Sequence, residues 1–405
     1  MKRRFIYIIL TFSILILFVS TKYPNSSIQY VGALETNTKK LIKYGWDSPR
    51  PEYMQKHIKE MEEKPFDGII FKLAQGNQVF KNEVYDAKII DKEIEFLKTT
   101  DFKKFTDNFV MMWLTPDKGW DWFSDSDWEK AKQNIYLFTK VVKKAELEGI
   151  AFDAEPYIAN TWRYSDFLNN QGKSYEDYYV QVRKRGAQFL SILQDEISDL
   201  KLFGLFYMSY VSDGFEVEDE DKLIELLSEH SYGLLPAFIN GMLDVIKPSS
   251  VIIDGNENAY YFNSEKDFIE SRELIKQKAL SLIEPENRSK YNNQVSVGQA
   301  VFFDNSYGLL NPNELNHPSV RVSHSLSKNN KKKLLEHNMY HALSNSDKYV
   351  WLYDTKVNWW EDKVPKAAIK AIVSAKDKIM LGKDLGFSIK NAIDEAYKGC
   401  CLKNK

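Results

Sequence analysis

Two short stretches of this 405-residue sequence place acidic side chains directly after an apolar run. The first contains Asp153 and Glu155, and the second contains Asp254 and Glu257. Residues two apart on a strand face the same side, so Asp153 and Glu155 should point together. Like charges held close together raise the pKa of one carboxyl group, and a carboxylic acid that stays protonated near neutral pH can act as a general acid. This pattern indicates acid/base chemistry.

Glycoside hydrolysis commonly needs two carboxyl groups across a sugar, about 5 Å apart for retention or about 6.5 to 9.5 Å apart for inversion. We expect Glu155 to be the general acid and Asp153 to tune it or to position the substrate. Glu257 or Asp254 would be the opposing base or nucleophile. No metal or organic cofactor is needed for this chemistry. Two structural alternatives stay open: the first pair could form ion pairs or cap a helix, and Asp254 could open an ordinary turn.

Aromatic and polar side chains gather near the ends of other apolar runs. Flat rings can pack on the apolar faces of sugars, while polar groups take the hydroxyls. The expected substrate-binding residues are Trp46, Asp47, Trp113, Tyr157, Tyr207, Asp304, Trp351 and Asp354. Further tryptophans follow at positions 120, 122, 128, 359 and 360. Several of these rings at strand ends would line a cleft, although large barrels also use Trp to fill their core.

Eight apolar runs, each ending in a polar or turn residue, have the pattern of buried parallel strands. They span residues 40–46, 68–74, 109–115, 149–155, 202–209, 251–254, 295–304 and 349–353. Helical patterns lie between them at 52–63, 127–147, 175–196, 219–229, 265–283, 331–343 and 366–378. In the helix at 127–147, apolar residues recur every three to four positions, and Ser126 with Glu129 predicts a capping box at its start.

This alternation of strands and helices predicts a single-domain (β/α)₈ TIM barrel over residues 34–390. A doubly wound open sheet is disfavoured, because no glycine-rich dinucleotide motif follows the first strand. In a parallel barrel the functional residues lie at the carboxyl ends of the strands. Acids that end the fourth and sixth strands would therefore meet at one mouth.

The fourth-strand segment, Gly149-Ile150-Ala151-Phe152-Asp153-Ala154-Glu155-Pro156-Tyr157, resembles the Asp-x-Glu signature of chitinase-like TIM-barrel glycoside hydrolases. The resemblance implies that Glu155 is the acid and that Asp153 orients an acetamido group or tunes Glu155. Ala151 stands where the family has a further Asp, and the family's Tyr-Pro order is reversed. The chain as a whole, including its Tyr44-Gly45-Trp46-Asp47 opening, looks like exported bacterial proteins of the glycoside-hydrolase barrel type, which implies a sugar-active role.

The N-terminus carries Lys2, Arg3 and Arg4, followed by an apolar run at 5–19. This is the pattern of an export signal, and a retained signal-anchor or a buried core helix are the alternatives. Residues 1–33 are therefore expected to be a signal peptide or anchor with a linker, and residues 391–405 a C-terminal tail. We expect a monomer outside the cytoplasm, secreted, periplasmic or anchored, which contacts the membrane only if the N-terminal segment is retained.

Other signals exclude several classes of function. The 55 basic and 57 acidic residues give a net charge of −2, so nucleic-acid binding is not expected. The two cysteines, Cys400 and Cys401, are adjacent and cannot join distant segments. His337 and His341 have the spacing of a zinc pair, but no Glu follows His337, so we expect a packing or surface role. The expected partner is a carbohydrate. A non-catalytic carbohydrate-binding barrel and a hydrolase of another bond remain alternatives.

Overall fold

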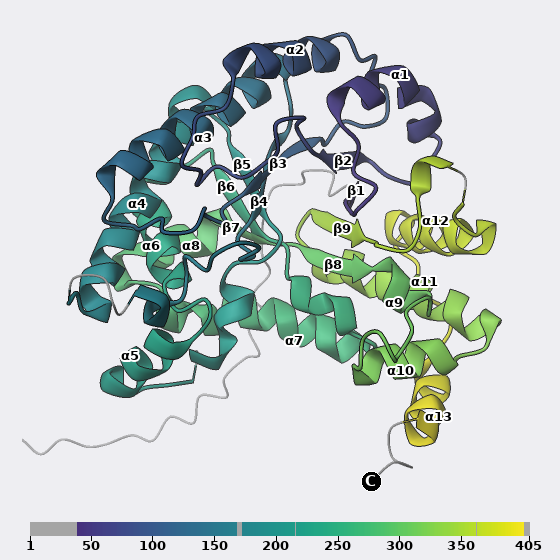
Figure 1. The fold of residues 1–405 in the computed structure, drawn as a ribbon. Coiled ribbons are helices and arrows are strands. Elements are labelled where there is room, and N and C mark those ends of the chain that lie inside the picture. Colours follow the sequence, from purple (N-terminus) through teal and green to yellow (C-terminus); the bar gives the residue numbers. More distant parts are fainter. Residues whose placement is uncertain (1–38, 168–171, 215, 362, 401–405) are drawn as a thin grey trace, which may run out of the picture. The chain divides into compact units, whose positions relative to one another are not determined.

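The computed structural model describes residues 39–167, 172–214, 216–361 and 363–400, and these residues build a parallel barrel (Figure 1). The strands are β1 (Lys40–Lys43), β2 (Gly68–Phe71), β3 (Phe109–Trp113), β4 (Gly149–Asp153), β5 (Lys201–Gly204), β6 (Val251–Asp254), β7 (Val295–Val297), β8 (Gln299–Phe302) and β9 (Tyr349–Tyr353). Their order is β7-β6-β5-β4-β3-β2-β1-β9-β8, and every neighbouring pair is parallel.

Strands β7 and β8 are separated only by Gly298, and together they fill one place in the ring. β7 pairs with β6 on one side, while β8 pairs with β9 on the other. The backbone N–H of Gly298 donates to the carbonyl oxygen of Asp254 at the end of β6, at 2.7 Å. The ring therefore has eight places, and the (β/α)₈ barrel predicted from the sequence is confirmed.

Helices alternate with the strands along the chain, and Figure 1 shows α1 to α4 following one another along the outer side of the strands. The helices are α1 (Pro51–Glu62), α2 (Ala87–Lys98), α3 (Asp125–Ala145), α4 (Tyr175–Glu196), α5 (Glu220–Glu229), α6 (Leu235–Val245), α7 (Glu265–Lys276), α8 (Arg288–Gln294), α9 (Phe303–Ser306), α10 (Pro318–Ser325), α11 (Lys328–Asn345), α12 (Lys366–Met380) and α13 (Lys390–Cys400). The seven helices expected from periodicity are all present, whereas α2, α6, α8, α9, α10 and α13 were not predicted.

Three details of the helices differ from the sequence-based expectation. The cap of α3 is Ser124, whose hydroxyl accepts from the backbone N–H of Asp127, so the predicted capping box at Ser126 and Glu129 is wrong. Helix α6 was missed because buried residues cover it from Leu235 to Leu243, which leaves no polar face to reveal a period. The segment expected as a C-terminal tail from residue 391 contains most of α13.

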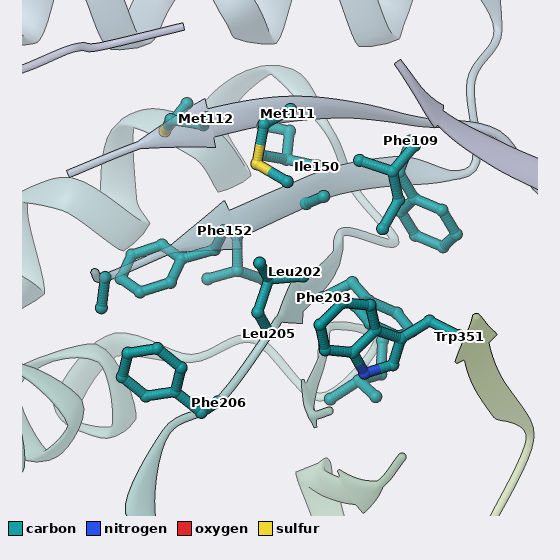
Figure 2. Packing of buried hydrophobic residues seen from close by; sticks show 14 of the residues in the cluster. Phe109, Met111, Met112, Ile150, Phe152, Leu202, Phe203, Leu205, Phe206 and Trp351 are labelled. Carbon is teal, nitrogen blue, oxygen red and sulfur yellow. The ribbon is translucent and has the colours of Figure 1, made fainter. Parts of the chain in front are cut away.

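The barrel interior is filled with large side chains, so it is a core and not a channel. The rings of Phe109, Phe203 and Tyr349 come from three different strands, and their centres lie 5.5 to 5.7 Å apart. Trp351 is two residues further along β9 and is fully buried. Figure 2 shows Phe109, Phe203 and Trp351 projecting into the space between the strands. This layer closes the barrel below the carboxyl ends of its strands.

Glycine sets the close contact between β4 and β5. A Cβ atom at Gly149 would lie 2.1 Å from the carbonyl oxygen of Lys201, which no other residue could tolerate. Gly149 thereby allows the register in which Ile150 lies opposite Leu202. In the part of the chain that is described, no helix has both the length and the apolar character to cross a membrane. The signal or anchor expected at residues 1–33 lies outside that part.

Candidate active site

A cavity of about 410 Å³ opens where the strands end. The lining residues follow β1, β2, β3, β4, β5, β6 and β9 or end those strands, so nearly the whole mouth of the barrel contributes. They are Tyr44, Gly45, Trp46, Lys72, Trp113, Glu155, Tyr157, Leu205, Glu257, Tyr260 and Tyr353. The cavity therefore occupies the face on which barrel proteins carry their functional residues.

Glu155 and Glu257 both line this cavity. Glu155 comes two residues after β4 and its side chain is exposed. Glu257 begins a short 3₁₀ helix, Glu257–Tyr261, and is partly buried. The chain enters that helix through Asn256, whose φ of 46° lies in the left-handed region that Asn tolerates better than most residues. Among the described residues, neither glutamate forms an ion pair.

Asp153 lies beneath the cavity and does not line it. Its side chain is fully buried, with one oxygen accepting from the backbone N–H of Glu155 at 2.9 Å and the other from the hydroxyl of Tyr157 at 2.7 Å. Burial raises the pKa of Asp153 to about 7, against the effect of these two hydrogen bonds. Asp153 thus fixes the backbone of Glu155 and the ring of Tyr157, which is a positioning role.

The electrostatics of the cavity act most strongly on Glu257. Its pKa is raised well above the usual value, first by burial and then by the negative charges of Asp153 and Glu155. A raised pKa favours the protonated form of a carboxyl group, which is the form that a general acid needs. The three acids therefore form one electrostatic cluster, in which burial and the two neighbouring charges favour the neutral form of Glu257.

Aromatic rings form much of the cavity wall. The expected residues Trp46, Trp113 and Tyr157 are among them, with the rings of Trp113 and Tyr157 5.3 Å apart. Trp46 is 77% exposed, and its indole N–H donates to the hydroxyl of Tyr353 at 2.7 Å. The ring of Tyr353 stacks on that of Tyr260 at 5.1 Å. The exposed rings of Trp46 and Tyr157 can receive the apolar face of a sugar.

Sequence reasoning missed several members of the cavity. Tyr44, Lys72, Leu205, Tyr260 and Tyr353 were not proposed as site residues. Four of them lie within, at the end of, or just after a predicted strand, so position alone could have marked them. Tyr260 lies six residues beyond β6, in the 3₁₀ helix that Glu257 begins, and only the path of the chain brings it to the cavity.

Four of the expected site residues accept hydrogen bonds inside the protein and do not line the cavity: Asp47, Asp254, Asp304 and Asp354. Asp254 accepts from the hydroxyl of Ser209 at 2.7 Å and from the backbone N–H of Asn256 at 3.1 Å. Asp304 accepts from the backbone N–H and hydroxyl of Thr355 at 2.6 and 3.0 Å. Asp254 and Asp304 are fully buried and do not line the cavity, so the expected contact with substrate is not formed by either.

Asp47 and Asp354 are engaged by one buried lysine. The ammonium of Lys43 lies 2.6 Å from Asp47 and 2.9 Å from Asp354, and Trp359 donates its backbone N–H to Asp47 and its indole N–H to Asp354. Burial raises the pKa of Asp354 to about 7, although the charge of Lys43 opposes this. This network holds β1 against the segment after β9, so the expected role of both acids in substrate binding is corrected to a structural one.

Two expected aromatic residues are core. Trp351 donates its indole N–H to the carbonyl of Gly255 at 2.8 Å inside the barrel, and Tyr207 is 2% exposed. Trp120, Trp122 and Trp128 pack around Phe80, away from the cavity. Of the tryptophans, only Trp46 and Trp113 are among the described residues that line the cavity.

His337 and His341 are buried, with ring centres 4.4 Å apart on α11. The described residues contain no group of three or more His, Cys, Asp or Glu side chains arranged to hold a metal ion. Both histidines line a cavity between α11, the start of α7 and residues 384–394, so their expected role in packing or at the surface stays a prediction.

Neither a protein-family model nor a curated protein sequence matches this chain. Several solved structures are similar to it, among them the following three. A GH18 chitinase from Pseudoalteromonas aurantia is 13% identical, with a TM-score of 0.40 over 83% of this chain and 99% of that one. A Bacteroidetes-affiliated GH5 cellulase linked with a polysaccharide utilization locus is 9% identical, with a TM-score of 0.46 over 89% of this chain and 96% of that one.

A glycoside hydrolase family 5 enzyme from Prevotella bryantii, solved with a xyloglucan tetradecasaccharide, is 9% identical, with a TM-score of 0.45 over 84% of this chain and 96% of that one. At these identities and scores the likeness carries no conclusion about chemistry. The class of protein is defined by the chain's own features, which are a (β/α)₈ barrel and a carboxylate-bearing, ring-walled cavity at its mouth.

Proposed function

We propose that this protein is a glycoside hydrolase that acts on a polysaccharide or glycan outside the cytoplasm. The observation that carries the proposal is that Glu155 and Glu257 line one cavity and have no ion-pair partner among the described residues. They follow β4 and β6, which are separated in the ring only by β5. Acid/base cleavage of a glycosidic bond requires two carboxyl groups that flank the bond, and Glu155 and Glu257 both face the cavity in which a sugar would lie.

The electrostatics favour Glu257 as the general acid. Its pKa is raised by burial and by the charges of Asp153 and Glu155, so it has a proton to give to the leaving oxygen. Glu155, which is exposed, then supplies the carboxylate that activates water or attacks the sugar. This order is the reverse of the assignment drawn from the sequence, in which Glu155 was the acid. Asp153 accepts a hydrogen bond from the backbone N–H of Glu155, and its charge raises the pKa of Glu257.

The walls of the cavity support a carbohydrate as the substrate. Trp46, Trp113 and Tyr157 present flat rings, and Tyr157 and Trp46 are at least half exposed. Rings of this kind pack on the C–H faces of sugars, while the carboxyl groups and hydroxyls nearby bind sugar hydroxyls. The export signal expected at residues 1–33 would place this cavity where polysaccharides occur.

The test is hydrolysis of a glycan panel by protein lacking residues 1–33. Glu155→Gln and Glu257→Gln should each lower turnover by about 10²- to 10⁴-fold, the usual contribution of acid/base groups. Glu225→Gln, which changes an exposed carboxyl group on α5, is the matched control and should leave turnover unchanged. Activity that survives both cavity variants would remove the proposal, and binding without any turnover would favour a non-catalytic carbohydrate-binding barrel.

Substrates with an activated leaving group separate the two roles. An aryl glycoside with a good leaving group needs little help from a general acid. Glu257→Gln should therefore keep much of its activity on such a substrate, whereas Glu155→Gln should lose activity on both substrates. The opposite pattern would return the acid role to Glu155.

A further inference from the structure

Among the described residues that line the cavity, Lys72 alone has a cationic side chain, and the proposed acid/base chemistry does not use it. It directly follows β2, and its ammonium lies 5.8 Å from the ring centre of Tyr44 and 5.6 Å from that of Trp113. Its side chain is partly buried. Across the described residues, no hydrogen-bond acceptor or ion-pair partner meets this ammonium.

The acids closest to Lys72 are already satisfied by other donors. Both oxygens of Asp153 accept hydrogen bonds, from the backbone of Glu155 and from Tyr157. Asp47 is held by Lys43 and by the backbone N–H of Trp359. Burial, and then the charge of Lys43, lowers the pKa of Lys72. The direction of this shift means that the groups around Lys72 do not fully compensate the positive charge of its ammonium.

The buried lysine next to it gives the contrast. Lys43 has two carboxylates within 3 Å, as buried cations normally do. Lys72 is partly desolvated beside two aromatic faces, and no carboxylate among the described residues pairs with it. A cation in that position gains most from an anion that arrives with the ligand.

Lys72 and Glu257 come from different sides of the barrel mouth. β2 and β6 are separated by four places in the eight-place ring, so Lys72 and Glu257 follow strands on opposite sides of the mouth. Beside Lys72, the rings of Tyr44 and Trp113 line the same side of the cavity. A sugar packed on these rings would bring its ring substituent to the ammonium.

We propose that Lys72, Tyr44 and Trp113 form a subsite for an acidic sugar, in which a uronic acid ring packs on the aromatic side chains and its carboxylate binds the Lys72 ammonium. This inference rests on the proposed function for its place in the reaction, because it names the substrate class of the same cavity. Lys72 is a specificity-determining residue in this arrangement and takes no part in bond cleavage.

The test compares uronic acid oligosaccharides with the same molecules after reduction of their carboxyl groups to alcohols. Oligogalacturonate, alginate and hyaluronan oligomers are the probes, and binding to the full-length protein in detergent is measured by calorimetry. The charged form should bind the wild-type protein at least about tenfold more tightly than its reduced form, as a charge-assisted hydrogen bond allows. Added salt should narrow that difference.

Lys72→Met should lower affinity for the charged probe by about ten- to a hundredfold and leave affinity for the reduced probe unchanged. Lys72→Arg should keep most of the preference. Lys81→Met is the matched control, because Lys81 also lies over a tyrosine ring, that of Tyr85, but is paired with Glu83 and is outside the cavity. The thermal midpoint of Lys72→Met should equal or exceed that of the wild type, whereas a structural role would lower it.

Equal binding of the charged and reduced probes, no binding of any charged probe, or an unchanged preference in Lys72→Met would each overturn the subsite. These results are separable from the failure of the proposed function. Hydrolysis of neutral glycans without dependence on Lys72 would retain the function and remove the subsite. Lys72-dependent binding of uronates without any hydrolysis would retain the subsite and remove the proposed function.

Discussion

The hydroxyl of Tyr157 donates a 2.7 Å hydrogen bond to the carboxyl group of Asp153, which lies four residues earlier at the end of β4. The other oxygen of Asp153 accepts from the backbone N–H of Glu155, between the two. The buried carboxyl group of Asp153 therefore fixes both the ring of Tyr157, which lines the cavity, and the backbone from which the side chain of Glu155 extends. A change at Asp153 should reach the cavity although Asp153 does not line it.

The first prediction concerns the pH dependence of stability. The pKa of Asp153 is about 7 in the folded protein and near its ordinary value of 3.8 in the unfolded chain. The protonated carboxyl group of Asp153 therefore makes its full contribution to the unfolding free energy below about pH 3.8. This contribution, about 4 kcal/mol in total, is lost as the pH rises through 7. Asp153→Asn should lose less stability than the wild type between pH 4 and pH 8.

Urea unfolding at a series of pH values measures this difference. Asp101→Asn, which changes an exposed carboxyl group, is the control and should follow the wild-type curve. Parallel pH curves for the wild type and Asp153→Asn would show that the buried carboxyl group of Asp153 does not titrate as described.

The second prediction concerns the proton on Glu257. Burial raises its pKa first, and the charges of Asp153 and Glu155 raise it further. Asp153→Asn and Glu155→Gln each remove one of these charges, so both should lower the pKa of Glu257. Carbon-13 NMR titration of the side-chain carboxyl group would measure the pKa without any need for activity. An unchanged titration in both variants would contradict the electrostatic cluster.

The third prediction separates the tryptophans of the cavity from those of the core. Trp46→Ala should weaken carbohydrate binding and leave stability nearly unchanged, because Trp46 is 77% exposed. Trp122→Ala should cost about 3 to 5 kcal/mol of unfolding free energy, since Trp122 is fully buried. Calorimetry measures carbohydrate binding and urea unfolding measures stability. Trp46→Ala should therefore lose mainly affinity, and Trp122→Ala should lose mainly unfolding free energy. Equal effects on stability would mean that Trp46 is held as a core residue.

The fourth prediction tests the buried charge network below the mouth. Lys43→Met leaves Asp47 and Asp354 without their cation, which should lower the unfolding free energy by about 3 to 5 kcal/mol. Lys56→Met is a matched control, because Lys56 also pairs with a carboxylate four residues away, that of Glu52, but on the exposed surface.

The control should lose no more than about 0.5 kcal/mol. Urea denaturation at pH 7 measures both values. If Lys43→Met were as stable as the control, the network around Lys43 could not be what joins β1 to the segment after β9.

The strands were predictable because burial on both faces leaves a continuous apolar run, which any window of the sequence shows. All eight predicted runs contain strands of the barrel, and the run at 295–304 holds both β7 and β8. The helices were predictable only where one face is polar. Helix α3 showed its period, whereas α6, buried along its length, did not.

The roles of the acids could not be read in the same way. Asp254 and Glu257 are three residues apart and both end the same strand region, yet one is an internal acceptor and the other lines the cavity. The difference depends on where Ser209 lies, 45 residues earlier in the chain. Asp304 and Asp354 likewise depend on partners brought by other strands.

The sequence by itself determined the barrel and its acidic fourth strand, because apolar runs and residue alternation are local properties of the chain. Only the tertiary structure decided which carboxyl groups line the cavity, that no described carboxylate pairs with Lys72, and that Tyr260 reaches the mouth. Those outcomes depend on distances and burial between segments far apart in sequence. Charge and proton affinity follow from these surroundings and not from residue type.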